Sequence, residues 1–593
     1  MCGIAGSYQF NNQGAALYNL ENANLKQWLR GPDGGGLYQL DGLVLGHRRL
    51  KIFDLSDRAA QPMVDHALGL ALVFNGAIYN FKELRKELEA KGYSFYSESD
   101  TEVLLKAYHA WGADCVSRIH GMFAFAVWER ETGTLVIARD RMGIKPLYYA
   151  NTADGFRFAS TLPALLEFEG IDTSIDKAAL HYYLTFHAVP EPRTILSGVR
   201  KLKPGSIMTV KSDGTTEVKP YWKLQVDENQ ANGSLDESQW LKATHDALLL
   251  ATGRQLAADV PVGVLLSGGL DSSLLVALAA QMGGHKIETF SIGFEGANGE
   301  AGDEFIYSDK VVEHFGTSHH KMYISNKQLT HSMAQCVASM SEPMTSHDNI
   351  AFYLLSQEVA KHVKVVLSGQ GADEMFAGYH WFHSIANDAT TPEQSGRTIL
   401  NTVADNTYEE YLQLVRPDFR TEDHAATFLE QMCRENATAN TVDNLLVYEG
   451  TFALTNGPLE RVDNMTMAAS LEARVPFLDE VVVEAAMKMP LRYKMPDGGK
   501  YILKQLGRKI LPREVVDRPK GYFPVPALRY PHGATLEFIR GVLSEENVRR
   551  RGMFEYKAIN EMLEHPLNHT TALGASKLWQ VGVLEYWLQQ QGL

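Results

Sequence analysis

A glycine-rich loop, Ser267-Gly268-Gly269, stands between a predicted strand, Val260–Leu266, and a predicted helix, Ser272–Gln281. The strand is a short, continuous apolar run, which is typical of a strand buried on both faces. The same strand and helix patterns recur further along, over Ile287–Phe294, Asn349–Lys361 and Val363–Leu367. This alternation predicts an α/β domain with a parallel sheet covered on both faces, followed from about residue 405 by a mostly helical part.

The first 160 residues follow a different pattern. Two amphipathic helices are predicted there, over Phe81–Lys91 and Thr101–Trp111. Around them, short apolar or alternating runs separated by Gly, Asp or Asn predict strands. These runs are Leu43–Phe53, Leu68–Phe74, Met122–Trp128, Leu135–Arg139 and Phe156–Ser160. Strands and helices mixed in this way predict an α+β layered domain.

A polar stretch rich in Asn, Gly, Ser and Asp, residues 222–238, separates the two patterns and is the best linker candidate. We therefore divide the chain into a first domain over residues 2–220, a linker over 221–238 and a second domain over 239–593. A chain of 593 residues is expected to form two large domains rather than a single core.

Charge and cysteine usage argue against several classes of function. The net charge is −15 and no run of Lys and Arg exceeds three, so we expect no nucleic-acid partner. Four scattered cysteines with no C-x-x-C pair argue against a disulfide framework and a structural zinc site. The chain opens without a signal-peptide pattern, and its apolar runs fall far short of the ~20 residues of a membrane span. We therefore expect a cytoplasmic protein with no membrane contact.

The cysteine at position 2 is the first candidate catalytic residue. Removal of Met1, which the small Cys2 side chain favours, would make Cys2 the first residue. Such a cysteine carries its own catalytic pair, because the thiol is the nucleophile and the α-amine, with a reference pKa of about 7.7–8.0, is a base. Taken alone, a cysteine at this position is more simply explained by chance.

Four further segments change that balance, namely Arg30–Asp33, His47–Leu50, Asn75–Asn80, which follows the strand predicted to end at Phe74, and Ser99–Glu102. Each has an ordinary explanation as a turn, a solvated charge pair, a hairpin or a helix N-cap. Together they supply what glutamine hydrolysis needs. A guanidinium clamps a carboxylate, a carboxylate holds an ammonium, and an Asn side chain with a Gly N–H forms an oxyanion hole worth about 3–4 kcal/mol per donor.

These motifs, in this order, resemble the class II glutamine amidotransferase domain, an N-terminal-nucleophile hydrolase, over about residues 2–215. The resemblance implies stacked antiparallel sheets between helices, with Cys2 as nucleophile. It also implies a carboxylate clamp at Arg49, an oxyanion hole at Asn75 and Gly76, and an ammonium partner at Asp100. Asparagine synthetases usually have Glu at the position of Ala77. The glutamine contact there is therefore missing or made by the backbone of Ala77.

The loop of the second domain is a candidate phosphate site. Its glycines let the backbone approach a ligand, and its hydroxyls, N–H groups and helix N-terminus suit an anion. Asp271 suits a Mg²⁺ that bridges phosphate oxygens. The segment is not of the Walker type, because no Gly-Lys-Ser/Thr ends it. A tight strand–helix turn is the ordinary alternative, but Ser267-Gly268-Gly269-Leu270-Asp271-Ser272-Ser273 after an apolar strand is a much more specific signal.

This segment resembles the PP-loop of ATP pyrophosphatases, as does a second loop, residues 368–374. The resemblance implies ATP as substrate, Asp373 as a second magnesium ligand, and Lys520 as the lysine that neutralises charge around an acyl-adenylate. A surface lysine in a loop is the ordinary alternative for Lys520. The segment Arg474–Asp479 also matches the family, and we interpret it as mainly structural. The implied ATP-binding residues are Leu266, Ser267, Gly268, Gly269, Asp271, Ser272, Ile292, Ser368 and Gly369.

The two halves together resemble the asparagine synthetase B family over nearly the whole chain. The resemblance implies that glutamine yields ammonia, that ATP activates a small carboxylate acceptor as an acyl-adenylate, and that ammonia displaces AMP to form an amide. Because protonation destroys the nucleophilicity of ammonia, we expect an internal tunnel between the two sites. ATP and Mg²⁺ are the expected substrate and metal, and a homodimer is left open.

The acceptor depends on Gln370, where asparagine synthetases commonly have Glu. A neutral Gln cannot act as a base, so aspartate is the second choice. Several segments resemble instead the N-acetylglutaminylglutamine amidotransferase branch, which amidates a dipeptide to make a compatible solute. They are Tyr182–Val189, Phe74–Phe81, Ile292–Tyr307, Met340–His347, Gly371–Ile385 and Lys520–Pro526. Tyr379, Trp381 and Phe382 are suited to a larger substrate, or equally to an ordinary core.

Two other functions were weighed. An enzyme like β-lactam synthetase would cyclise its substrate without ammonia and would lack the working nucleophile, which Cys2 and its clamp argue against. A non-catalytic storage or regulatory protein would be expected to lose at least one of the two loops, and both are complete.

Overall fold

The computed structural model describes residues 2–593 except 11–16, 41, 228–234, 284–285, 297–301, 386–390, 437, 439, 519–530 and 572–573. The N-terminal part contains two six-stranded sheets, and every strand pair in them is antiparallel. One sheet has the order β10 (Arg200–Lys201), β8 (Tyr148–Thr152), β9 (Gly155–Ala159), β1 (Cys2–Gln9), β3 (Leu43–Arg49) and β2 (Gly34–Leu40). The other has the order β12 (Thr216–Pro220), β11 (Ser206–Val210), β7 (Thr134–Arg139), β6 (Gly121–Glu129), β5 (Leu70–Ile78) and β4 (Met63–Asp65).

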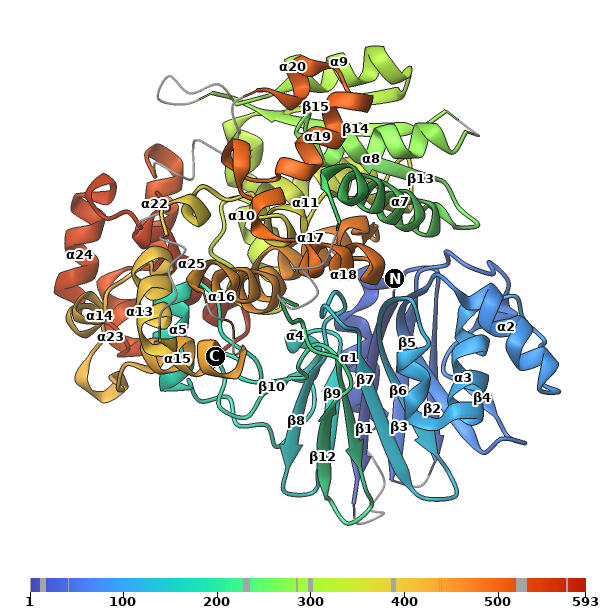
Figure 1. Ribbon diagram of the computed structural model, residues 1–593. Coiled ribbons are helices and arrows are strands. Elements are labelled where there is room, and N and C mark those ends of the chain that lie inside the picture. The colour runs from blue at the N-terminus through green and yellow to red at the C-terminus, as the bar shows by residue number, and fades with distance from the viewer. Residues whose placement is uncertain are drawn as a thin grey trace.

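The two sheets face each other across an apolar layer and are covered by helices outside. Ile4 and Leu45 from one sheet and Val73 and Ile137 from the other share one buried cluster. The outer faces pack against α1 (Leu17–Lys26) and α4 (Leu162–Leu165) on one side, and against α2 (Phe81–Ala90) and α3 (Asp100–Trp111) on the other. The predicted antiparallel sheets between helices are confirmed (Figure 1).

The C-terminal part is built on a five-stranded sheet whose strand pairs are all parallel, as predicted. Its order is β15 (Ser318–Ile324), β14 (Glu288–Phe294), β13 (Val262–Leu265), β16 (Val365–Leu367) and β17 (Glu472–Arg474). Successive residues of β13 point to opposite faces, so that Val264 packs in one cluster and Leu265 in another. One face is covered by α7 (Glu237–Leu256), α8 (Leu270–Gln281) and α19 (Tyr501–Ile510), and the other by α11 (Asp348–Val359) and α17 (Glu460–Met467).

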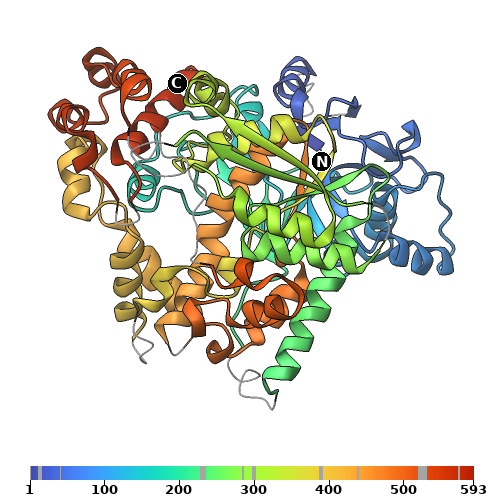
Figure 2. The ribbon, with the colours of Figure 1, turned by 90° about the horizontal axis from the view of Figure 1, so that it is seen from above.

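The remaining helices lie before, between and after these strands along the chain, and beyond about residue 405 the described chain is mostly helical, as predicted. Figure 2 shows the last of them, in red, at the side of the molecule away from the N-terminal segments in blue. They are α5 (Lys177–Phe186), which belongs to the first part, α9 (Phe305–Phe315), α10 (Asn326–Ala338), α12 (Ala372–Met375), α13 (Pro392–Val403), α14 (Tyr408–Leu414), α15 (His424–Asn436), α16 (Thr441–Tyr448), α18 (Glu480–Lys488), α20 (Arg513–Val516), α22 (Gly533–Val542), α23 (Glu545–Arg551), α24 (Tyr556–Glu564) and α25 (Lys577–Gln590). Among the described residues, no helix is long and apolar enough to cross a membrane.

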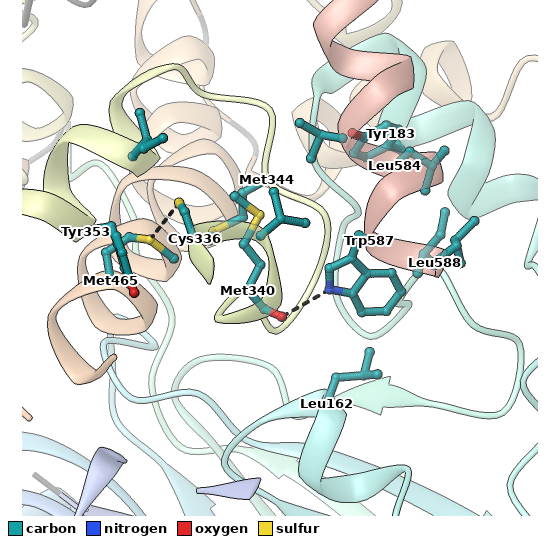
Figure 3. Close-up of a cluster of buried hydrophobic side chains, with 14 of the residues drawn as sticks. Leu162, Tyr183, Cys336, Met340, Met344, Tyr353, Met465, Leu584, Trp587 and Leu588 are labelled. Atoms are coloured by element: carbon teal, nitrogen blue, oxygen red, sulfur yellow. Dashed lines mark hydrogen bonds between the residues drawn. The ribbon is translucent and has the colours of Figure 1, made fainter. Parts of the chain in front are cut away.

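Apolar packing joins the two parts. Leu162 of α4 and Tyr183 of α5 belong to the same buried cluster as Trp587 of α25 (Figure 3). The indole of Trp587 donates to the backbone oxygen of Met340 at 3.0 Å, so its one polar group is satisfied inside the core. The Tyr183 hydroxyl donates to the Gln580 carbonyl at 2.8 Å. The last helix therefore holds both parts of the chain together.

A group of buried charged side chains reinforces this interface between the two parts, which we call the seam. Arg30 of the first part donates to both carboxylate oxygens of Asp463 in α17, at 2.7 and 3.3 Å. Lys145 lies 3.5 Å from the same carboxylate, and all three side chains are at most 5% exposed. Burial raises the pKa of Asp463, but Arg30 and Lys145 together hold it below its usual value. The two cations thus share one anion in a largely desolvated environment.

Replacement of Asp463 by Asn should destabilise the whole chain, because it leaves two buried cations without their anion. We expect Asp463→Asn to reduce the free energy of unfolding by about 3–5 kcal/mol. The measurement is the thermal unfolding midpoint of the full chain. The matched control is Asp246→Asn, which removes the exposed pair between Asp246 and Lys242 and should leave the midpoint unchanged. Equal midpoints for both variants would contradict a stabilising role of the seam pair.

Candidate functional site

Strand pairing places Cys2 directly opposite Arg49, at the ends of β1 and β3. The backbone N–H of Cys2 donates to Asn75 Oδ1 at 3.0 Å, and its carbonyl accepts from Arg30 Nε at 3.1 Å. Burial raises the pKa of the Cys2 thiol, while the chain's amino-terminal charge and Arg49 act in the opposite direction. The backbone of Cys2 is therefore fixed on both sides, and its thiol needs a base to ionise.

The predicted end of the strand at Phe74 is wrong, because β5 continues to Ile78. The whole segment pairs with β6, with Asn75 opposite Ala124 and Gly76 opposite Phe123. The Asn75 Nδ2 atom is buried and has no hydrogen-bond partner among the described residues. A Cβ at position 76 would lie 2.2 Å from the Met122 carbonyl oxygen, so only glycine fits there. The strand thus presents an unsatisfied N–H donor beside Cys2, as an oxyanion hole requires.

Two charged side chains complete the pocket that the sequence predicted. Arg49 donates Nη1 to the Ser56 carbonyl at 2.8 Å and Nη2 to the Asp54 carbonyl. Asp100 opens α3 after the N-cap Ser99, and its Oδ2 accepts from the Ile78 N–H at 3.1 Å. Burial raises the pKa of Asp100 to about 6, and the negative charge of Glu472 adds to this effect.

The predicted glutamine-binding residues meet in one small pocket of about 30 Å³. Those that line it are Cys2, Arg49, Gly76, Ala77 and Asp100. Asn75 lies next to them through its bond to Cys2. The Ala77 side chain is a buried methyl group, so it offers no charge to a ligand. One residue of the C-terminal part, Glu472, also lines this pocket, and no sequence pattern predicted it there.

The glycine-rich loop of the C-terminal part turns sharply between β13 and α8. Gly268 has a φ of +75°, and a Cβ there would lie 2.6 Å from the Ser308 backbone nitrogen. Gly269 is the N-cap of α8. Its N–H donates to Ser267 Oγ at 3.3 Å, and this oxygen lies 3.1 Å from Ser272 Oγ. The loop therefore presents hydroxyl groups at a helix N-terminus, which suits an anion.

A cavity of about 190 Å³ opens where β13, β14 and β16 end. Ligands of α/β proteins bind at this carboxyl edge of a parallel sheet. The cavity contains most of the predicted ATP residues, which are Leu266, Ser267, Asp271, Ser272, Ile292, Ser368 and Gly369. Gly268 and Gly269 form the turn behind them. Gln370, on which the expected choice of acceptor depends, also lines the cavity.

Asp271 and Asp373 converge on one cation, the ammonium of Lys500, at 2.6 and 2.8 Å. Burial lowers the pKa of Lys500, but the two carboxylates more than compensate and raise it above its usual value. Two convergent carboxylates are a donor set that fits Mg²⁺. No group of three or more metal-ligating side chains is found in the part of the chain that the structure describes. A magnesium ion here would therefore take further ligands from phosphate oxygens or water.

Lys500 is a functional candidate that sequence reasoning missed. It follows Gly498 and Gly499, both with positive φ, and is the N-cap residue before α19 (Tyr501–Ile510), with a φ of 54°. A Cβ at Gly499 would lie 2.1 Å from the Ala377 carbonyl oxygen, so this close approach needs glycine. The Gly-Gly-Lys sequence before a helix was the available signal. Lys520, the predicted catalytic lysine, lies outside the described residues.

The aromatic residues considered for the acceptor divide into two groups. Phe382 is fully buried in the helical core. Tyr379 and Trp381 stack with ring centroids 4.3 Å apart. Their polar atoms donate to Glu374 and Glu449, each at 2.7 Å. None of the three lines the cavity at Gln370, so packing within the helical part accounts for them.

Comparison with known proteins matches both parts of the chain. Residues 1–222 match the glutamine amidotransferase domain model and residues 243–589 the asparagine synthase model. The chain is 32% identical to asparagine synthetase [glutamine-hydrolyzing] 1 of Bacillus subtilis (strain 168), over 99% of this chain and 96% of the relative. It is also 30% identical to asparagine synthetase [glutamine-hydrolyzing] 3 of the same strain, over 95% of this chain and 93% of the relative.

A putative asparagine synthetase of Mycobacterium tuberculosis (strain ATCC 25618 / H37Rv) is 31% identical, over 94% of this chain and 91% of the relative. Among solved structures, glutamine phosphoribosylpyrophosphate amidotransferase from B. subtilis covers 56% of this chain and 92% of its own, at 14% identity and a TM-score of 0.29. The whole-length relatives and the two matched models decide the assignment: the chain belongs to the asparagine synthetase family and is a glutamine-hydrolysing amidotransferase ligase.

Proposed function

We propose that the pocket at Cys2 hydrolyses glutamine. The observation that carries this proposal is the unsatisfied Nδ2 donor of Asn75, buried beside a cysteine that Arg49 faces. With Met1 removed, the α-amine of Cys2 takes the thiol proton, and Sγ attacks the side-chain amide carbon of glutamine. Asn75 Nδ2 and the Gly76 N–H hold the oxyanion. The α-ammonium of Cys2 then gives its proton to the leaving nitrogen, ammonia departs, and water cleaves the thioester to release glutamate.

Arg49 and Asp100 hold the two ends of the amino acid in this proposal. The Arg49 guanidinium clamps the α-carboxylate of glutamine, exchanging its present bonds to the Ser56 and Asp54 carbonyls for a charged partner. The Asp100 carboxylate faces the α-ammonium, and Ala77 supplies backbone alone. Binding of a cation beside Asp100 also offsets the burial that raises the pKa of this carboxyl.

The cavity of the C-terminal part is the proposed site of adenylation. The loop from Ser267 to Ser272 receives the ATP phosphates, and Leu266 and Ile292 contact the base. Asp271 and Asp373 would hold Mg²⁺, which supplies positive charge at the phosphate oxygens. The acceptor carboxylate displaces pyrophosphate from the α-phosphorus, and ammonia then displaces AMP from the acyl carbon. Lys500, fixed between the two aspartates, neutralises charge that develops on the phosphates.

We propose the terminal carboxylate of N-acetylglutaminylglutamine as the acceptor. Gln370 supports this choice, because it lines the cavity with an amide in place of a carboxylate. A glutamine side chain both donates and accepts hydrogen bonds, which matches the amide groups of an acetylated dipeptide. Aspartate is the second candidate, since the most similar relatives are named asparagine synthetases.

Replacement of Cys2 by Ala tests the first site. Cys2→Ala should abolish glutamine-dependent amide synthesis and leave ammonia-dependent synthesis unchanged, because only the nucleophile is lost. Pyrophosphate release with each nitrogen source is the measurement. Asp271→Asn is the complementary variant and should abolish both activities. Full glutamine use by Cys2→Ala would contradict the assignment of the pocket.

Replacement of Lys500 by Met tests the second site, since it removes the charge and keeps the length of the side chain. Ammonia-dependent synthesis should fall by about 100-fold or more, the scale on which a lost electrostatic partner of a transition state acts. Glutamine hydrolysis without ATP should remain. Lys504→Met, one helical turn away on the exposed side of α19, is the matched control and should retain synthesis.

The acceptor is tested by mixing the protein with glutamine, MgATP and either aspartate or N-acetylglutaminylglutamine. We expect pyrophosphate release with the dipeptide alone, and a product in which the OH of the terminal carboxyl group has been replaced by NH₂, identified by mass spectrometry. Turnover with aspartate alone would identify an asparagine synthetase and show that Gln370 does not decide the acceptor.

A further inference from the structure

The pocket at Cys2 has one wall from the other half of the chain. Glu472, the first residue of β17, lines it together with Cys2, Asp100 and Ala77. Its backbone is held in the parallel sheet, opposite Val365, and its N–H donates to the Lys364 carbonyl at 2.9 Å. The side chain is 1% exposed. A carboxylate of the ATP-side sheet therefore reaches the glutamine side of the molecule.

This carboxylate is fixed in place and stays ionised. Arg474 Nε donates to Glu472 Oε1 at 2.6 Å, and the same guanidinium is held by the carbonyls of Gln255 and Ala257 at 2.7 and 2.6 Å. Burial raises the pKa of Glu472, but the amino-terminal charge of the chain, Arg474 and Lys145 outweigh it and lower the pKa to about 2. A buried anion of this kind needs a cationic environment to persist.

The pocket as a whole has more negative charge than the Arg49 clamp requires. Glu472 and Asp100 both line it, and the charge of Glu472 acts on both Asp100 and Cys2. Ala77, the neighbour of the oxyanion donors, contributes a methyl group alone. Two carboxylates facing one small pocket repel each other, and a ligand cation placed between them relieves that repulsion. Glutamine carries such a cation, its α-ammonium.

We propose that Glu472 positions glutamine by pairing with its α-ammonium, so that the ammonium is held jointly by Asp100 and by a residue of the ATP-binding half. This inference rests on the proposed glutamine site at Cys2. Glu472 is then a substrate-positioning residue. The glutamine pocket is complete when the two halves of the chain are packed against each other.

The test distinguishes a loss of α-ammonium recognition from a general loss of structure at the pocket. Glutamine is compared with glutaramate, which is glutamine without its α-amino group, as substrates or competing ligands for hydrolysis without ATP. In Glu472→Gln, kcat/KM for glutamine should fall about 10- to 100-fold, the scale of one charge-assisted hydrogen bond. Binding and hydrolysis of glutaramate should not change. The preference of the protein for glutamine over glutaramate should therefore fall by the same factor.

The controls use the same chain. Glu480→Gln removes another seam carboxylate, which pairs with Arg141 and does not line the Cys2 pocket, and it should keep the preference for glutamine. Glu472→Asp keeps the charge but shortens the side chain, so it should restore part of the preference. Ammonia-dependent synthesis by Glu472→Gln should equal that of the unmodified protein, which shows that the variant is folded.

Two outcomes would overturn the inference. A preference for glutamine that is unchanged in Glu472→Gln would show that the α-ammonium does not contact this carboxylate. An equal loss for glutamine and glutaramate would show a structural role of the Glu472–Arg474 pair. Both outcomes are compatible with an inactive Cys2→Ala variant, so they leave the proposed function standing. Glutamine hydrolysis by Cys2→Ala would instead overturn the proposed function itself.

Discussion

The buried pair between Arg30 and Asp463 is the interaction on which the arrangement of both sites depends. The guanidinium of Arg30 donates Nε to the Cys2 carbonyl and its other two nitrogens to Asp463 in α17. A buried charge is tolerated only while its partner and its remaining hydrogen bonds are present. Separation of the two halves would therefore break this ion pair and leave the guanidinium that holds the Cys2 carbonyl without its anion, which ties the position of Cys2 to the docking of the C-terminal half.

β17 lies between the two sites. Its first residue, Glu472, lines the Cys2 pocket, while the carbonyl of its last residue, Arg474, accepts from the Ser368 N–H at 2.8 Å in the loop that lines the cavity at the end of the parallel sheet. A strand of three residues thus connects the Cys2 pocket with this cavity.

Features that depend on residues close together in the sequence could be predicted from it. The turn at Gly268 was predictable because a strand, two glycines and a helix leave few other conformations. Asn75 was placed beyond the end of its strand because its polar side chain interrupts the apolar run, while the continuation of that strand is fixed by pairing with β6. Lys500 and Glu472 were missed since their partners lie hundreds of residues away, and only tertiary packing brings them together.

The cavity at the carboxyl edge of the parallel sheet is lined by both charged and uncharged groups. The stacked Tyr379 and Trp381 donate to Glu374 and Glu449, and neither ring lines this cavity. Burial, reinforced by Asp373, raises the pKa of Glu374 to about 7. Within the loop of residues 368–374, Gln370 lines the cavity, and its amide can donate or accept a hydrogen bond but does not titrate. At this position the cavity therefore offers hydrogen bonding rather than a charge.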